Sequence, residues 1–152
     1  MREDEGARYL EIVNSAIRGL ASSHYPADVI AGWVVPVTEE SVRDLMRNPD
    51  NEIRLVAELD GVPVGIAALV PAHSELRGCY VSPDAARQGC GSALVIELER
   101  LARAHGVTHL ELAASLNAEP FYAAHGYDVR ERSEVVLTNG HRMPCVWMRK
   151  TL

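Results

Sequence analysis

A segment between an expected strand and an expected helix constrains this chain more than any other feature. Residues 75–81 read as a strand, which Ser82-Pro83-Asp84 closes, and the run Gln88-Gly89-Cys90-Gly91-Ser92 then opens an amphipathic helix. The first turn of a helix has N–H groups without intrahelical partners, and glycine lets an anion approach them closely. Arg87 adds a cation whose planar group suits phosphate. We therefore expect this turn to bind a phosphate-bearing ligand.

Two common phosphate-binding loops fit this segment poorly. The Lys-Ser/Thr pair of a nucleotide-triphosphatase loop does not follow the glycines. A dinucleotide-binding fingerprint would lie in an opening strand–helix–strand unit, whereas here helices and a hairpin come first. The segment therefore indicates a different class of phosphate ligand.

The rest of the chain alternates between helical and strand periodicity. Helices are expected over about residues 4–20, 26–33, 38–47, 89–105 and 117–125, and strands over 53–59, 62–70, 75–81, 108–113, 127–137 and 145–150. Asp60-Gly61 is the strongest hairpin signal, and Thr138-Asn139-Gly140 marks a second hairpin. The order predicts an α/β (α+β) fold in one domain over residues 1–152, with a mixed, mostly antiparallel sheet and helices on both faces.

Composition excludes several classes of protein. The net charge of −6 argues against non-specific binding to nucleic acid, and no apolar run is long enough to span a membrane. The three cysteines are far apart, which indicates neither a disulfide framework nor a zinc site. The acidic start, Met1-Arg2-Glu3-Asp4-Glu5, lacks the features of a secretion signal. We expect a cytoplasmic protein without a metal.

A second motif lies downstream, over residues 114–127, Ala-Ser-Leu-Asn-Ala-Glu-Pro-Phe-Tyr-Ala-Ala-His-Gly-Tyr. Taken alone, its Phe121 and Tyr122 are more often core aromatics than catalytic groups. Together with the glycine loop, in this order and at this separation, the motif resembles the GNAT N-acetyltransferases. The family's loop reads Arg/Gln-x-x-Gly-x-Gly/Ala; here Gly89 and Gly91 match it and Ala86 departs. The family's usual first strand is nearly missing, because only Met1-Arg2 precede the first helix.

The resemblance implies that acetyl-CoA is the cosubstrate and that a primary amine of a small molecule, peptide or protein is the acceptor. The alternative function is a non-catalytic acyl-CoA sensor. A homodimer is a possible assembly of the chain. By the resemblance, the cofactor contacts would come from nine residues: Tyr80, Val81, Arg87, Gln88, Gly89, Cys90, Gly91, Ser92 and Asn117.

The resemblance also implies catalytic roles. Tyr122 would protonate the departing thiolate, and a backbone N–H near Val81 would stabilise the oxyanion. Counting back from the first loop glycine places the general base at Glu75. An equally good interpretation is that Glu75 is a solvated residue at the start of a strand. His73, Glu111 and a chain of water molecules are the other candidates for the base.

Overall fold

Three helices precede the sheet in the computed structural model, which describes residues 2–152. They are α1 (Glu3–Ala16), extended by a π-helical turn over Ile17–Ala21, then α2 (Ala27–Trp33) and α3 (Glu39–Arg47). Thr38 caps α3 as its sequence predicts, because its hydroxyl accepts a hydrogen bond from the Ser41 N–H at 3.2 Å.

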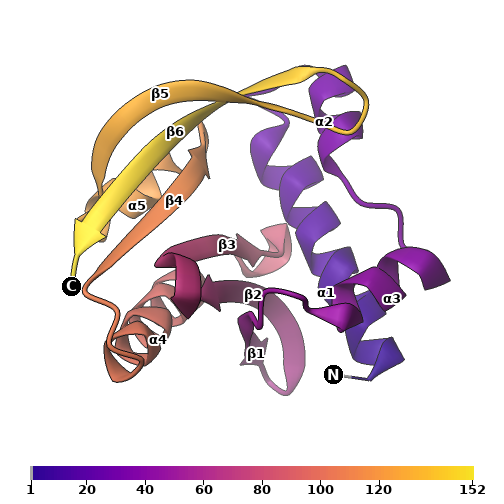
Figure 1. The fold of residues 1–152 in the computed structure, drawn as a ribbon. Coiled ribbons are helices and arrows are strands. Elements are labelled where there is room, and N and C mark those ends of the chain that lie inside the picture. The colour runs from indigo at the N-terminus through magenta and orange to yellow at the C-terminus, as the bar shows by residue number, and fades with distance from the viewer. Residues whose placement is uncertain (1) are drawn as a thin grey trace.

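The sheet has six strands in the order β1-β2-β3-β4-β6-β5, and every neighbouring pair except β3–β4 is antiparallel (Figure 1). The strands are β1 (Ile53–Leu59), β2 (Val62–Val70), β3 (Glu75–Val81), β4 (His109–Ser115), β5 (Asp128–Val136) and β6 (Arg142–Thr151). Positive φ angles at Asp60 and Gly61 turn β1 into β2, as expected of an Asp-Gly hairpin.

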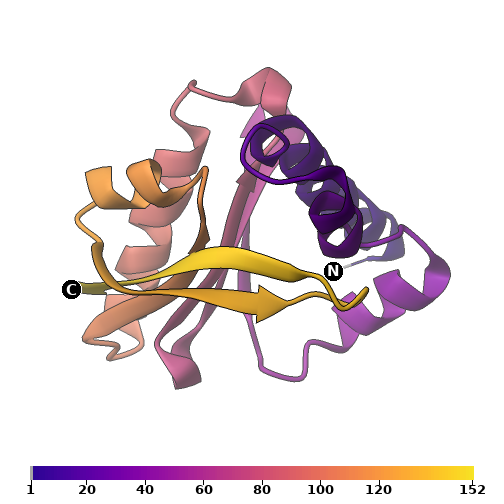
Figure 2. The ribbon, with the colours of Figure 1, turned by 90° about the horizontal axis from the view of Figure 1, so that it is seen from above.

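Helices cover both faces of the sheet (Figure 2). Helix α4 (Cys90–Ala104) connects the parallel strands β3 and β4, and the short α5 (Glu119–Ala124) follows β4. The side chains of Leu94, Val95 and Leu98 on α4 are buried in the main core, together with Leu110 and Leu112, which alternate inward along β4. On the other face, Ile12, Val13 and Ile17 of the first helix pack against Ile66 of β2.

Strands β3 and β4 are paired at one position only, Glu75 with Glu111. Beyond that pair the two strands diverge, which Figure 1 shows as a widening gap between their ribbons. The backbone groups of β3 that face β4 past Glu75 therefore have no strand partner. We call the region where β3 diverges from β4 the seam. It lies between a half-sheet of β1, β2 and β3 and a half-sheet of β4, β6 and β5.

These observations confirm the predicted mixed, mostly antiparallel sheet with helices on both faces. The last strand differs from its prediction, because β6 begins at Arg142 rather than Cys145. Met143, which is buried, pairs with Val135 of β5 and extends the inward alternation of the hairpin by one further step. Within residues 2–152, no helix has both the length and the apolar character needed to cross a membrane.

Candidate active site

A cavity of about 270 Å³ lies in the seam. It is lined from β3 by Leu76, Arg77, Gly78, Cys79 and Tyr80, from β4 and the turn after it by Leu112, Ala113, Ala114, Ser115 and Ala118, from α5 by Tyr122, from α2 by Trp33, and from the last hairpin by Val135, Leu137, Met143 and Cys145. The diverging strands make the hollow, and the segments around it supply the walls. Two of the predicted site residues, Tyr80 and Tyr122, therefore meet in one cavity.

The glycine loop lies at the open end of β3, where α4 begins. Gly89 is the residue before the helix and has φ +85°, a conformation that favours glycine. A Cβ atom at Gly89 would meet no heavy atom within 4 Å, so its face of the loop is open. A Cβ atom at Gly91 would lie 3.2 Å from the Phe121 ring, so Gly91 is needed for packing instead. The two glycines thus have different roles.

The side chains of the loop are unequal as ligands for an anion. Gln88 donates from Nε2 to the Asp84 carbonyl at 3.2 Å, and Ser92 Oγ lies 3.0 Å from Nε2 of His125. Cys90 is buried, whereas Arg87 is exposed and makes no hydrogen bond or ion pair with any residue that the structure describes. Arg87 itself has φ +61°, an uncommon backbone conformation for a residue with a side chain. Its guanidinium is therefore the free cation of this loop.

Tyr122 is buried within the aromatic cluster of α5. Its ring centroid lies 5.2 Å from that of Phe121 and 5.8 Å from that of Tyr127, both at edge-to-face angles. Burial, followed by the neighbouring Cys79, raises the pKa of Tyr122 well above its ordinary value. The phenol is therefore protonated at neutral pH, with a hydroxyl that no described residue binds.

The thiols beside this cavity are protonated as well. Burial raises the pKa of Cys79 to about 12, and burial also raises the pKa of Cys145. Neither is activated as a nucleophile, because the thiolate is the reactive form. Among the described residues, no group of three or more His, Cys, Asp or Glu side chains is placed to hold a metal ion.

Asn117 lies in the turn between β4 and α5, next to the cavity-lining Ala118 but not itself in the lining. Its Oδ1 atom is buried and has no hydrogen-bond partner. A buried acceptor without a donor costs free energy, so this amide oxygen is an unsatisfied group of the chain.

Glu75 lies at the closed end of the seam, one residue before the cavity lining, and is not brought next to Tyr122. Arg77 donates to the two carboxylate oxygens of Glu75 at 3.3 and 3.0 Å, and also binds Asp50 and Glu52. The other candidates for the base gather here too. His73 Nδ1 is 3.9 Å from the Glu75 carboxylate, and Glu111 is the strand partner of Glu75. A proton moving from the cavity to Glu75 would need water between them.

Several wall residues could not be predicted from the sequence. Val135, Leu137 and Met143 come from the last hairpin, whose alternating pattern indicates strands but not that its tip extends over the seam. The tip is held by α2, because Thr138 Oγ1 donates to the Gly32 carbonyl at 3.2 Å. Figures 1 and 2 show the hairpin reaching α2. A Cβ atom at Gly32 would clash with the Asn139 side chain, so the tip approaches α2 this closely because residue 32 is a glycine.

Of the aromatic residues near α2, one lines the cavity and another packs behind it. Trp33 lines the cavity, and Tyr25 packs edge-on against it at 5.8 Å between ring centroids. The Tyr25 hydroxyl donates to the Pro144 carbonyl at 2.6 Å and accepts from the Leu116 N–H at 2.8 Å. His24 is exposed and does not line the cavity.

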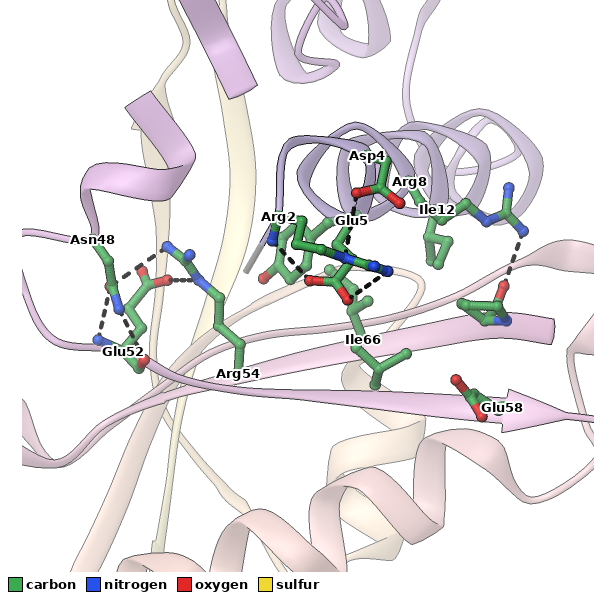
Figure 3. A pocket seen from close by; sticks show the side chains of 13 residues that line it. Arg2, Asp4, Glu5, Arg8, Ile12, Asn48, Glu52, Arg54, Glu58 and Ile66 are labelled. Carbon is green, nitrogen blue, oxygen red and sulfur yellow. Dashed lines mark hydrogen bonds and ion pairs between the residues drawn. The ribbon is translucent and has the colours of Figure 1, made fainter. Parts of the chain in front are cut away.

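A second hollow, of about 640 Å³, lies between α1 and β1 (Figure 3). Its charged residues largely satisfy one another: Arg54 pairs with Glu52 at 2.8 Å, and Arg2 pairs with Glu5 at 3.4 Å. Neither Tyr80 nor Tyr122 lines it, whereas both line the seam cavity. The seam cavity is therefore the better candidate for chemistry.

Comparisons with known proteins agree on one kind of enzyme. The acetyltransferase (GNAT) family matches residues 17–127. A solved structure of a GCN5-related N-acetyltransferase from Rhodopseudomonas palustris is similar, with 29% identity and a TM-score of 0.90 over 100% of this chain and 92% of that one. The PaiA N-acetyltransferase of Thermoplasma acidophilum, solved with coenzyme A, has 18% identity and a TM-score of 0.77 over 100% and 96%.

A phosphinothricin acetyltransferase from Sinorhizobium meliloti, solved with acetyl-CoA, has 18% identity and a TM-score of 0.71 over 100% of this chain and 85% of that one. A search of curated protein sequences gives no match. These three structures share the fold of this chain, and one of them is named for its acceptor.

Proposed function

The chain belongs to the GNAT acetyltransferase family, and we propose that it transfers the acetyl group of acetyl-CoA to a primary amine by direct attack. The seam carries this proposal, since it leaves the inner edge of β3 without a strand partner along the cavity that Tyr122 lines. A pantetheine arm is an extended chain with amide groups, so it can use the hydrogen-bonding groups that β4 leaves free.

The residues around the seam fit coenzyme A. The backbone N–H groups at the start of α4 and the guanidinium of Arg87 would hold the pyrophosphate, with the open face of Gly89 allowing close approach. Asn117 Oδ1 would accept from a pantetheine amide, which gives that buried atom a partner. A β3 backbone N–H near Val81 would bind the carbonyl oxygen as negative charge develops on it. Bound acetyl-CoA supplies an activated thioester carbonyl.

Tyr122 is our candidate for the general acid. Its raised pKa makes it a weaker acid than free tyrosine, but the same burial would raise the pKa of a thiol formed beside it, as it does for Cys79. The difference between the pKa of Tyr122, the proton donor, and the pKa of the thiol that forms therefore stays moderate. The hydroxyl is free to donate, because no described residue already binds it.

Glu75 is our candidate for the base, acting through water. It is the first carboxylate beyond the cavity lining on β3, next to Leu76. Its contacts with Arg77 hold the carboxylate in place at the closed end of the seam. The chain thus places the acid at one wall of the cavity and the base beyond its closed end.

The test is an assay of thiol release and acetylated product, in which acetyl-CoA and a mixture of primary amines are incubated with the protein. We expect thiol and acetyl-amine to form in equal amounts. A sensor would instead raise its melting temperature with coenzyme A while releasing no thiol above background.

A further inference from the structure

The acceptor end of the seam cavity is walled by apolar and aromatic side chains. Trp33, Tyr80, Leu137 and Met143 line it, and no Asp, Glu or His side chain is among the lining residues that the structure describes. Arg77 is the one charged residue of the lining, and its guanidinium is already bound by Asp50 at 2.6 Å and Glu52 at 2.8 Å. The cavity therefore has no free carboxylate with which to bind a second cation.

This wall is held in place before any acceptor arrives. Tyr25 supports the ring of Trp33 and ties α2 to the backbone at Pro144 and Leu116. Asn139 Nδ2 donates to the Asp28 carbonyl at 2.9 Å and fixes the tip of the hairpin that carries Leu137. An acceptor must therefore fit the existing wall, because the bonds to Pro144 and from Asn139 would break if the hairpin moved away.

The size of the cavity limits the acceptor. Its volume is about 270 Å³, whereas a dry cavity of about 150 Å³ already holds benzene. The acetyl group and the adjoining part of the pantetheine arm take part of this space, so an acceptor can place at most one ring or one branched chain in it.

Resting on the proposed function, we propose that the acceptor is a small primary amine with a single positive charge and an aromatic or branched apolar body. A polyamine would bury a second cation without a partner, which is costly. The apolar body of the favoured amine would contact Trp33 and Leu137, and its burial is favourable.

The reaction balances with these groups. Desolvation lowers the pKa of the amine, so its proton passes to water more easily. The nitrogen lone pair forms a C–N bond to the acetyl carbon while the C–S bond breaks, and Tyr122 gives its proton to the departing sulfur. The nitrogen gives up its surplus proton as the amide forms, and this proton restores Tyr122 through water, while the first amine proton leaves through water toward Glu75. The products are the N-acetyl amine and free coenzyme A.

The first experiment compares kcat/KM for phenethylamine and isoamylamine with that for putrescine and for lysine amide, at one concentration of acetyl-CoA. We expect the apolar amines to exceed the diamines by at least about tenfold, the scale of discrimination that a few buried groups provide. Equal or higher kcat/KM for putrescine would overturn the inference. If no amine is acetylated, the proposed function fails instead, whatever the acceptor class.

The second experiment places a carboxylate in the wall. Leu137→Glu should raise the putrescine-to-phenethylamine ratio by about tenfold or more, since a buried cation then gains a partner, with an unchanged KM for acetyl-CoA. Val136→Glu is the matched control. The Val136 side chain is next to Leu137 in the sequence, but it is 69% exposed and does not line the cavity. A folded Leu137→Glu variant with an unchanged ratio would contradict the inference. Should it not fold, Leu137→Ala decides: undiminished kcat/KM for phenethylamine in that variant overturns it.

Discussion

At the scale of single residues, a substitution at Tyr122 can distinguish a catalytic role of its hydroxyl from the packing of its ring. Replacing Tyr122 with phenylalanine removes the hydroxyl and keeps the ring contacts with Phe121 and Tyr127. If the hydroxyl protonates the leaving thiolate, kcat should fall by about 10²–10⁴-fold, with little change in the KM for acetyl-CoA. The melting temperature should stay close to wild type, because no described residue hydrogen-bonds this hydroxyl. Steady-state kinetics and thermal melts check both expectations.

Tyr127→Phe is the matched control for that experiment. Its hydroxyl donates to Glu99 at 3.3 Å, away from the cavity lining. This variant should lose stability and keep its turnover. Wild-type turnover in Tyr122→Phe would show that water or the acceptor supplies the proton, and that Tyr122 is a core aromatic.

Gly89 allows a similar separation of cofactor binding from backbone strain. Gly89→Ala should weaken acetyl-CoA binding, because the new methyl group occupies the open face of the loop. Gly106→Ala is the control: it lies after the other end of α4, has φ +76°, and its Cβ would also meet nothing within 4 Å. Both variants should lose about 1–2 kcal/mol of stability from the left-handed backbone. Calorimetric titration with coenzyme A should show weaker binding for Gly89→Ala only; equal binding by both would place the pyrophosphate elsewhere.

Glu75→Gln tests the base at the closed end of the seam. Turnover should fall most at low pH, where the amine carries its proton and most needs a base. The control is Glu111→Gln, because Glu111 is the backbone partner of Glu75 across the seam and binds Arg149 at 3.4 Å. Its pH–rate profile should match wild type. An unaltered profile for Glu75→Gln would instead leave His73, Glu111 or water as the base.

At the scale of elements, a buried ion pair ties α4 to β6. Lys150 Nζ lies 2.8 and 2.9 Å from the two carboxylate oxygens of Glu99, whose side chain is 7% exposed. Lys150→Met would leave that carboxylate without its main partner, at a cost of about 3 kcal/mol. Urea denaturation should show a lower midpoint. Arg100→Met, which breaks an exposed pair with Glu97 on the same helix, should leave the midpoint unchanged.

Combining Lys150→Met with Glu99→Leu removes both charges and should recover part of the loss. A single Lys150→Met variant as stable as wild type would show that Arg103, 3.8 Å from Glu99, replaces the lysine.

Most elements could be predicted from the sequence because their signals are local. The spacing of Leu94 and Leu98 on α4 and the turn at Asp60-Gly61 act within a few residues, and the structure has both as expected. The residues predicted for the candidate site lie at the two ends of β3, where α4 begins, in the turn after β4 and on α5. The part contributed by Leu137 and Met143 could not be predicted, because it depends on where the tip of a distant hairpin binds α2.

At the scale of the whole molecule, the protein's five tyrosines share one property: burial is the largest cause of a raised pKa at Tyr9, Tyr25, Tyr80, Tyr122 and Tyr127. For Tyr9 the pKa rises to about 12. Unfolded tyrosines lose their protons near pH 10. The stability from these buried phenols is therefore complete below about pH 10 and is lost as the pH rises above it, because the unfolded state then releases more protons than the folded one.

We accordingly expect phenolate absorbance to appear in one cooperative step, together with the loss of far-ultraviolet circular dichroism. A gradual rise in phenolate near pH 10, with the dichroism unchanged, would contradict the burial of these rings.

The seam has a consequence for how acceptor preference can change in such a chain. The glycine loop and β3 belong to the first half-sheet with its crossover helix, whereas Leu137 and Met143 belong to a hairpin that reaches the cavity from the far side. The hairpin meets α2 through its tip and shares no strand pairing with β3. Under the proposed function, substitutions in the hairpin would therefore exchange one acceptor for another without altering the glycine loop. Catalysis and selectivity are, in this sense, separately evolvable parts of one small protein.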